Sequence, residues 1–241
     1  MTRQQFFLAC ALLAAIPPLA DPRGAHAARS TSPPLSVTLL YDLSVGVSSV
    51  PLAKDEGFKR IVKWVVTYLR PADQLRLGFL TQRPRLTRPF MRQELATLWP
   101  DVIAKVSVPD AERFGASPLW DSLDVVVRAV AQDPGRRAIL VLTDGRATGN
   151  RIGVNTLVAD ANAFGVSIWP IAYGPSEWYL PDRDGRITDP SQLLSQLAKA
   201  TGGRFTPEPA LPELSSMEFA FQAISNNVQN NIVGILRSLH Q

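Results

Sequence analysis

Apolar residues along this chain fall into two patterns, short continuous runs and longer stretches with helical spacing. The runs Val37 to Tyr41 and Ala138 to Leu142 consist mainly of β-branched and other apolar residues, which is typical of strands buried on both faces. From Pro51 to Arg70, apolar residues recur three and four positions apart with Lys and Arg between them. This spacing predicts an amphipathic helix, which Pro71 ends.

The rest of the chain continues the alternation of strands and helices. We predict further strands at Leu75 to Thr81, at Val166 to Tyr173 and, shortest and last, at Arg204 to Pro207, with an edge strand or hairpin arm at the proline-interrupted segment Arg85 to Phe90. We predict further helices at Arg92 to Val106, at Pro118 to Val130 with Ser117 as N-cap, at Gly153 to Phe164, at Leu193 to Thr201 and at Leu214 to Leu239. This alternation predicts the α/β class: a three-layer, doubly wound, mainly parallel sheet with helices on both faces and a short antiparallel edge strand.

The first 27 residues have the features of a secretory signal peptide. Arg3 supplies the positive charge, Phe6 to Leu19 the apolar stretch, and Ala25-His26-Ala27 a small-residue cleavage site. The apolar stretch is shorter than the ~20 residues that a membrane-spanning helix needs. We therefore expect cleavage near Ala27, a secreted or periplasmic protein, and no transmembrane segment in the mature chain.

The remaining chain is predicted to form one domain. Hydrophobic residues make up 46% of the 241 residues, which is enough for one sizeable core. We expect residues 28–35 to be a flexible lead-in, 36–207 to form the domain, and 208–241 to form a helical extension packed on or beside it. The net charge of +4 is small, and the Lys and Arg residues are scattered along the chain without a basic stripe that also carries aromatic residues. Nucleic-acid binding is therefore not predicted.

Cleavage near Ala27 removes the only cysteine, Cys10, and leaves His240 as the only histidine. This excludes thiol catalysis and Cys-ligated metals, and it argues against a Ser-His-Asp hydrolase, a His-ligated zinc site or a His general base. No glycine-rich phosphate loop follows any predicted strand, which argues against a dinucleotide-binding domain. Any chemistry must therefore use carboxylates, hydroxyls, Lys and Arg.

Oxygen-bearing side chains occur where predicted strands end or a helix begins. Asp42 and Ser44 follow the first strand, Ser117 precedes a helix, and Asp144 follows the strand that ends at Thr143. Because the carboxyl ends of parallel strands share one edge of a sheet, we expect these side chains to converge. Hydroxyls and carboxylates without His or Cys are the ligand set of a hard cation such as Mg²⁺, Ca²⁺ or Mn²⁺.

The order of these motifs resembles the von Willebrand factor A domain over about residues 35–206. That family has a metal-ion-dependent adhesion site (MIDAS) built from a D-x-S-x-S loop, a later threonine and the aspartate of a T-D-G turn. Asp42 and Ser44 stand at the first two positions, Ser117 in G-A-S-P-L-W-D-S-L at the threonine, and Asp144 in L-T-D-G at the last aspartate. The segments I-W-P-I-A-Y-G and L-A-K-A-T-G-G-R-F also resemble late parts of the family.

The resemblance implies an exported, noncatalytic protein-binding domain of the adhesion or scaffold type. Mg²⁺, or else Ca²⁺ or Mn²⁺, would be held by Ser44 and Ser117, with Asp42 and Asp144 behind water, and an acidic residue of a protein partner would complete the shell. Gly46 stands where the family has its second loop serine and offers no ligand. The alternative is a vestigial site whose carboxylates are held by backbone N–H groups and hydroxyls.

Other segments offer partner contacts or other functions. The 175–190 loop is longer than a typical connection and carries Trp178 and Tyr179, which are candidate partner-binding residues together with Arg146 beside the T-D-G turn. A metal-independent scaffold or assembly role, through this loop or through the C-terminal helix, is a second hypothesis. A metal-assisted phosphohydrolase that uses the paired carboxylates is a third.

Two further groups of side chains are interpreted as structural. An arginine cluster near the edge strand suits a solvated edge that resists aggregation, with an acidic partner as the alternative; it comprises Arg83, Arg85, Arg88 and Arg92. Four tryptophans fall inside predicted elements and are expected in the core, namely Trp64, Trp99, Trp120 and Trp169.

Overall fold

The computed structural model describes residues 32–42, 56–81, 83–105, 118–143, 145, 147–172, 190–207 and 217–241. Ser32–Gln241 form one compact unit, whereas Met1–Thr31, with the predicted signal peptide and cleavage site, lie outside the described residues. Within the described part of the chain, no helix is both long enough and apolar enough to cross a membrane.

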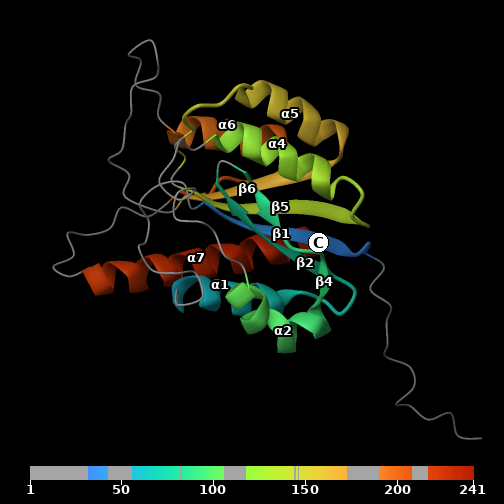
Figure 1. Ribbon diagram of the computed structural model, residues 1–241, viewed down its shortest axis with the longest axis vertical. Coiled ribbons are helices and arrows are strands. Elements are labelled where there is room, and N and C mark those ends of the chain that lie inside the picture. The colour runs from blue at the N-terminus through green and yellow to red at the C-terminus, as the bar shows by residue number, and fades with distance from the viewer. Residues whose placement is uncertain are drawn as a thin grey trace, which may run out of the picture. The chain divides into compact units, whose positions relative to one another are not determined.

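The centre of the domain is a six-stranded sheet in the order β3-β2-β1-β5-β6, with β4 also paired to β2 (Figure 1). Four strands run parallel, and the two short strands β3 and β4 run antiparallel to β2. The strands are β1 (Leu35–Asp42), β2 (Gln74–Leu80), β3 (Arg85–Leu86), β4 (Phe90–Met91), β5 (Arg136–Thr143) and β6 (Val166–Ala172). The predicted mainly parallel sheet with a short antiparallel edge is confirmed.

Helices cover both faces of this sheet, which confirms the three predicted layers (Figure 1). One face carries α1 (Glu56–Tyr68), α2 (Arg92–Lys105) and α7 (Met217–His240). The other face carries α4 (Leu119–Val130), α5 (Val154–Ala163) and α6 (Pro190–Ala200). Each helix is held by an apolar stripe, as in α4, where Leu119, Leu123, Val126, Val127 and Val130 are buried.

The central strand β1 is buried at all of its positions and distributes its side chains between the two cores. Leu35, Val37, Leu39 and Tyr41 join the core beneath α1 and α7, whereas Leu40 joins the core beneath α4 and α6. Because strand side chains alternate between faces, Asp42 belongs to the same face as Leu40. The last residue of β1 is therefore directed towards the α4 side of the sheet.

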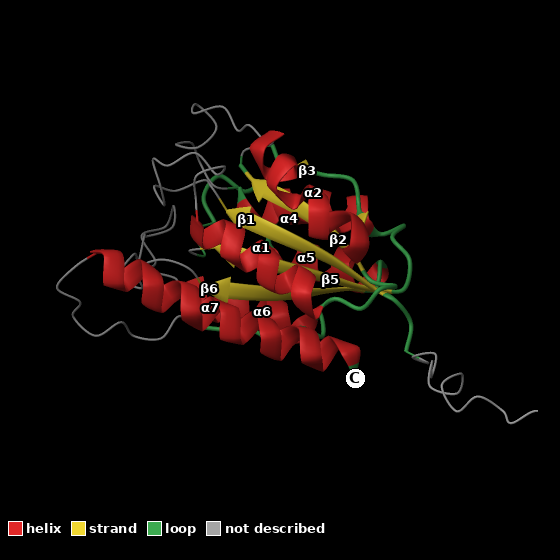
Figure 2. Cartoon of the chain, turned by 90° about the horizontal axis from the view of Figure 1, so that it is seen from below, coloured by secondary structure: helices red, strands yellow, loops and turns green. Residues whose placement is uncertain are grey.

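The C-terminal helix α7 belongs to the main core. Its buried residues recur at helical spacing, and it lies beside α1 on the same face of the sheet (Figure 2). These residues are Val228, Ile232, Ile235, Leu236 and Leu239, all part of the same apolar cluster as Phe58 and Val62 of α1. Removing α7 would expose this cluster to water, so the helix is a structural part of the layer.

Several details differ from the predictions. The predicted final strand is reduced to a single bridge between Thr206 and Ile171. Trp120 and Trp169 are buried as expected, but Trp64 is 37% exposed and stacks on Tyr68 at a ring distance of 5.8 Å, so its assignment to the core is wrong. The side chain of Trp99 lies outside the described residues.

The arginine cluster lies at and beside the edge strand β3 and is partly paired within the domain. Arg88 forms an ion pair with Glu94 at 2.9 Å, and its guanidinium stacks on Phe90 at 4.1 Å. The Arg88 side-chain hydrogen bond is the main cause that lowers the pKa of Glu94, with a backbone N–H as the second. Arg83 and Arg85 are exposed, which fits a solvated edge.

Candidate functional site at the carboxyl edge of the sheet

Asp42 and Thr143 end the adjacent strands β1 and β5 and meet at the carboxyl edge of the sheet. The Thr143 hydroxyl donates a hydrogen bond of 2.7 Å to Oδ2 of Asp42, which is only 5% exposed. The same hydroxyl accepts a hydrogen bond of 3.0 Å from the backbone N–H of Gly145. Thr143 therefore orients a buried carboxylate at the edge where ligands of parallel α/β sheets bind.

Of the four predicted metal ligands, Asp42 is described, and it lies at the end of β1. Ser44, Ser117 and Asp144 lie outside the described residues, so their convergence with Asp42 stays a prediction. The same holds for the candidate partner-binding residues, which are Arg146, Trp178 and Tyr179, and for Gly46. The described residues next to these positions in the chain are therefore the basis for describing the site.

The helix α4, which begins close after Ser117, is capped by a residue from another loop. The helix begins at Leu119, one residue later than predicted, and its cap residue Pro118 provides no side-chain hydrogen bond. Instead, Oδ1 of Asn150 accepts a hydrogen bond of 2.7 Å from the N–H of Trp120, and the N–H of Asp121 lies at 3.4 Å. Asn is a preferred capping residue, but no local pattern connects this one to a helix that starts about 30 residues earlier.

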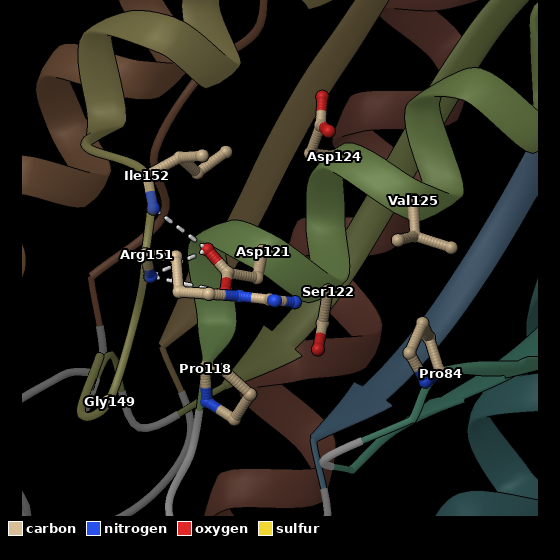
Figure 3. A pocket seen from close by; sticks show the side chains of 9 residues that line it. All are labelled: Pro84, Pro118, Asp121, Ser122, Asp124, Val125, Gly149, Arg151 and Ile152. Carbon is tan, nitrogen blue, oxygen red and sulfur yellow. Dashed lines mark hydrogen bonds and ion pairs between the residues drawn. The ribbon is translucent and has the colours of Figure 1, made fainter.

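Asp121 of α4 in turn accepts hydrogen bonds from the loop that carries Asn150. Its Oδ1 accepts hydrogen bonds of 3.0 Å from the backbone N–H groups of Arg151 and Ile152, and its Oδ2 accepts one of 3.3 Å from Nε of Arg151 (Figure 3). Burial raises the pKa of the Asp121 carboxyl, but the hydrogen bonds from Ile152 and Arg151 outweigh this effect and leave the pKa below its ordinary value. Asp121 is therefore ionised at neutral pH.

A surface pocket of about 440 Å³ opens beside this contact (Figure 3). It is lined by Pro84, Pro118, Asp121, Ser122, Asp124, Val125, Gly149, Arg151 and Ile152. Val125 is 52% exposed, and the Ser122 hydroxyl donates to the backbone oxygen of Thr81 at 3.1 Å, which ties α4 to the end of β2. The pocket thus lies next to the start of α4, where Pro118 directly follows the predicted ligand Ser117.

The predicted ligands would suit a hard cation by their chemical type, and Asp42 is the one that the structure describes. Among the described residues, no group of three or more His, Cys, Asp or Glu side chains is placed to hold a metal ion. A cation site would therefore need the hydroxyls of Ser44 and Ser117 and the carboxylate of Asp144 in addition to the buried Asp42. Such an oxygen-only set suits Mg²⁺, Ca²⁺ or Mn²⁺.

No protein-family model matches the sequence, and no curated protein matches it. Among solved structures, an aerotolerance-related membrane protein from Bacteroides fragilis is similar with a TM-score of 0.53 and 17% identity, over 85% of this chain and 99% of that chain. A von Willebrand factor type A protein from Catenulispora acidiphila is similar with a TM-score of 0.59 and 13% identity, over 85% of this chain and 43% of that chain.

A third similar structure is proximal thread matrix protein 1 from the mussel byssus, described with a zinc-occupied MIDAS motif. Its TM-score is 0.55 at 15% identity, over 83% of this chain and 46% of that chain. Identities this low bear on the fold alone. With the sheet order and the layers described above, they show that the chain has the fold of a von Willebrand factor A domain, as its motifs predict.

Proposed function

We propose that the chain is an exported, noncatalytic protein-binding domain that holds a divalent cation at the carboxyl edge of its sheet. The observation that supports this most is the buried carboxylate of Asp42, oriented by Thr143 at that edge. Ser44 and Ser117 would bind Mg²⁺, Ca²⁺ or Mn²⁺ directly, and Asp42 and Asp144 would hold its water ligands. An acidic side chain of the partner protein would complete the shell.

The chemistry of the donors supports this role. When bound, the cation supplies a positive centre that attracts a carboxylate, whereas the proposed ligands of the chain itself all offer oxygen atoms. Gly46 contributes no side chain, and water can take its position, because both Mg²⁺ and Ca²⁺ keep water ligands in many protein sites. The zinc-occupied MIDAS motif of the mussel byssus protein is a precedent for metal binding on this fold.

The partner is proposed to contact more than the cation. Trp178 and Tyr179 of the 175–190 loop and Arg146 are the side chains that we expect to touch it. Aromatic residues and arginine are enriched in the cores of protein–protein interfaces. Replacing Trp178 by Ala should therefore weaken partner binding without changing cation binding, whereas EDTA should weaken partner binding in both the wild type and Trp178→Ala.

Calorimetric titration of the purified protein with Mg²⁺, Ca²⁺ and Mn²⁺ tests the cation site. Asp144→Ala should abolish the heat of binding, because it removes one of the two proposed carboxylates. Asp101→Ala is the matched control, because Asp101 is an exposed carboxylate on α2, on the other face of the sheet. Equal heats in the wild type and Asp144→Ala would contradict the proposed site.

A metal-independent scaffold or assembly role is the second candidate. The hydrogen bond from Thr143 stabilises the Asp42 carboxylate without any cation, which is what a vestigial site requires. A wild-type protein that gives no heat with any of the three cations, yet binds its partner in EDTA, would favour this role. Turnover of a generic phosphoester would instead indicate a phosphohydrolase. Export is tested separately by N-terminal sequencing of exported material, in which an intact Met1 would contradict cleavage near Ala27.

A further inference from the structure

Two side chains connect α4 and the loop that follows β5. Asn150 of the loop accepts from a backbone N–H of α4, and Asp121 of α4 accepts from backbone N–H groups of the loop. We propose that this pair, the Asn150–Asp121 clamp, is a positioning device that holds the start of α4 against the loop after β5 and so sets the cation affinity of the carboxyl edge. The inference rests on the proposed function, since it concerns two of the proposed ligands. It assigns a role to two residues that lie outside the ligand set.

The first half of the clamp satisfies the start of a helix. The first N–H groups of any helix lack partners within the helix, and Pro118 offers α4 no side-chain hydrogen bond. Asn150 supplies the missing acceptor through the 2.7 Å contact to the N–H of Trp120. The Asn150 loop therefore stabilises the first turn of α4 in this position.

The second half holds the loop in return. Both N–H groups at 151 and 152 donate to the Asp121 carboxylate at 3.0 Å. A carboxylate in the first turn of a helix is also favoured by the positive end of the helix dipole. The two halves depend on one another, because moving the loop removes the cap and moving the helix removes the acceptor.

The clamp lies close in the chain to both proposed ligands. Ser117 is three residues before Trp120, and Asp144 is six residues before Asn150. The start of the loop is already held, because the Gly145 N–H donates to Thr143 at 3.0 Å. The clamp holds residues 150–152 of the same loop on α4, the helix that Ser117 precedes in the chain.

The guanidinium of Arg151 adds little to this arrangement. Its side chain is 91% exposed and gives Asp121 one contact of 3.3 Å, whereas the main contact comes from the backbone N–H. Exposed ion pairs contribute little to stability. The clamp therefore depends on Asn150 and Asp121, and Arg151→Ala should leave it in place.

Calorimetric cation titration of matched variants tests the clamp. Asn150→Ala should weaken cation affinity about 10-fold, which is the usual scale for losing a residue that orients metal ligands. Asn150→Asp keeps the capping oxygen and should bind the cation at least as tightly as the wild type. Asn162→Ala is the control, because it removes an Asn side-chain hydrogen bond away from the edge, an exposed one to the oxygen of Ala200 between α5 and α6, and should leave the affinity unchanged.

Amide hydrogen exchange distinguishes loss of the clamp from general destabilisation of the domain, because it reports on individual backbone N–H groups. In Asn150→Ala, exchange should quicken at Trp120 and at Ile152 together, although Asn150 itself contacts only the first of these two N–H groups. Asp121→Asn tests the other half of the clamp and should quicken exchange at the same two amides. Exchange that changes at Trp120 alone would overturn the reciprocal clamp.

The outcomes separate the clamp from the cation proposal. If the wild type binds a cation and Asn150→Ala binds it equally well, the clamp has no role in the site and this inference alone is wrong. If neither the wild type nor Asp144→Ala gives a heat of binding with any of the three cations, the cation proposal fails and the inference fails with it. Weaker binding in Asn150→Ala, restored in Asn150→Asp, is the result that supports it.

Discussion

His240 and Asp73 lie 167 residues apart in the chain, yet Nε2 of His240 is 2.9 Å from Oδ2 of Asp73. Asp73 is completely buried and also accepts hydrogen bonds from the backbone N–H groups of Leu35 at 2.9 Å and Arg70 at 2.7 Å. One carboxylate thus joins the start of β1, the end of α1 and the end of α7. This node lies at the amino edge of the sheet, at the end of β1 opposite Asp42.

Replacing His240 by Ala should lower the free energy of unfolding by about 1–2 kcal/mol, because it removes one hydrogen bond to a buried carboxylate. Asp73→Ala should cost more, about 3–5 kcal/mol, because it removes the acceptor of the Leu35 and Arg70 backbone N–H groups and the ion-pair partner of the partly buried Arg70 guanidinium. Urea unfolding measures both. Ser238→Ala, an exposed position in the same helix, is the control, and a His240→Ala midpoint equal to it would contradict the node.

Stability should also fall in acid through Asp73. Burial raises the pKa of Asp73, but hydrogen bonds from the Arg70 side chain, from the Leu35 and Arg70 backbone N–H groups and from His240 outweigh it, so the folded pKa lies below the ordinary 3.8. A depressed carboxyl pKa contributes stability that is present above the unfolded pKa and is lost as pH falls through the folded pKa. Urea midpoints between about pH 2 and pH 6 should therefore drop in acid, and less steeply in Asp73→Asn.

Two glycines should respond to alanine in opposite directions. A Cβ at Gly203 would lie 1.9 Å from the backbone oxygen of Ile168 in β6, so Gly203→Ala should cost about 1–3 kcal/mol or more. A Cβ at Gly234 of α7 meets nothing within 4 Å, so Gly234→Ala should add about 0.5–1 kcal/mol by favouring the helix. Thermal unfolding compares the two variants. Unchanged stability in Gly203→Ala would mean that this residue does not pack on β6.

The strands and helices were predictable because each pattern has a local physical cause. In β1, apolar residues face two cores and every position is buried, so a continuous apolar run is what the fold requires. In α1, the side chains with helical spacing are the ones that reach the core, such as Phe58, Val62 and Val65. Trp64 was misplaced because position within an element does not tell which side of a helix meets the sheet.

The contacts that join distant segments were not predictable in the same way. Asn150 caps a helix about 30 residues before it in the chain, and His240 meets Asp73 from the other end of the domain. Neither pairing has a spacing signature, because each follows from how the layers pack. The position of Asp42 at the end of a strand was predictable, whereas the hydroxyl of Thr143 that orients it entered the prediction only as part of the T-D-G turn.

Thr143 provides a test of the site that does not alter any proposed ligand. Thr143→Val has almost the same shape but removes the hydroxyl that donates to Asp42 and accepts from the Gly145 N–H. Leaving these buried groups without that hydroxyl should cost about 1–3 kcal/mol in urea unfolding. If Asp42 supports a cation, its altered orientation should also weaken binding about 10-fold in calorimetry.

Thr143→Ser separates the hydroxyl from the methyl group of the same side chain. It retains both hydrogen bonds and should keep cation affinity near the wild-type value, whereas Thr156→Val, at an exposed position of α5, controls for the loss of a hydroxyl elsewhere. Because Val favours strands at least as well as Thr, lower stability in Thr143→Val cannot come from strand propensity. A Thr143→Val protein that is as stable as the wild type and binds the cation equally well would show that the Asp42–Thr143 hydrogen bond does not organise this edge.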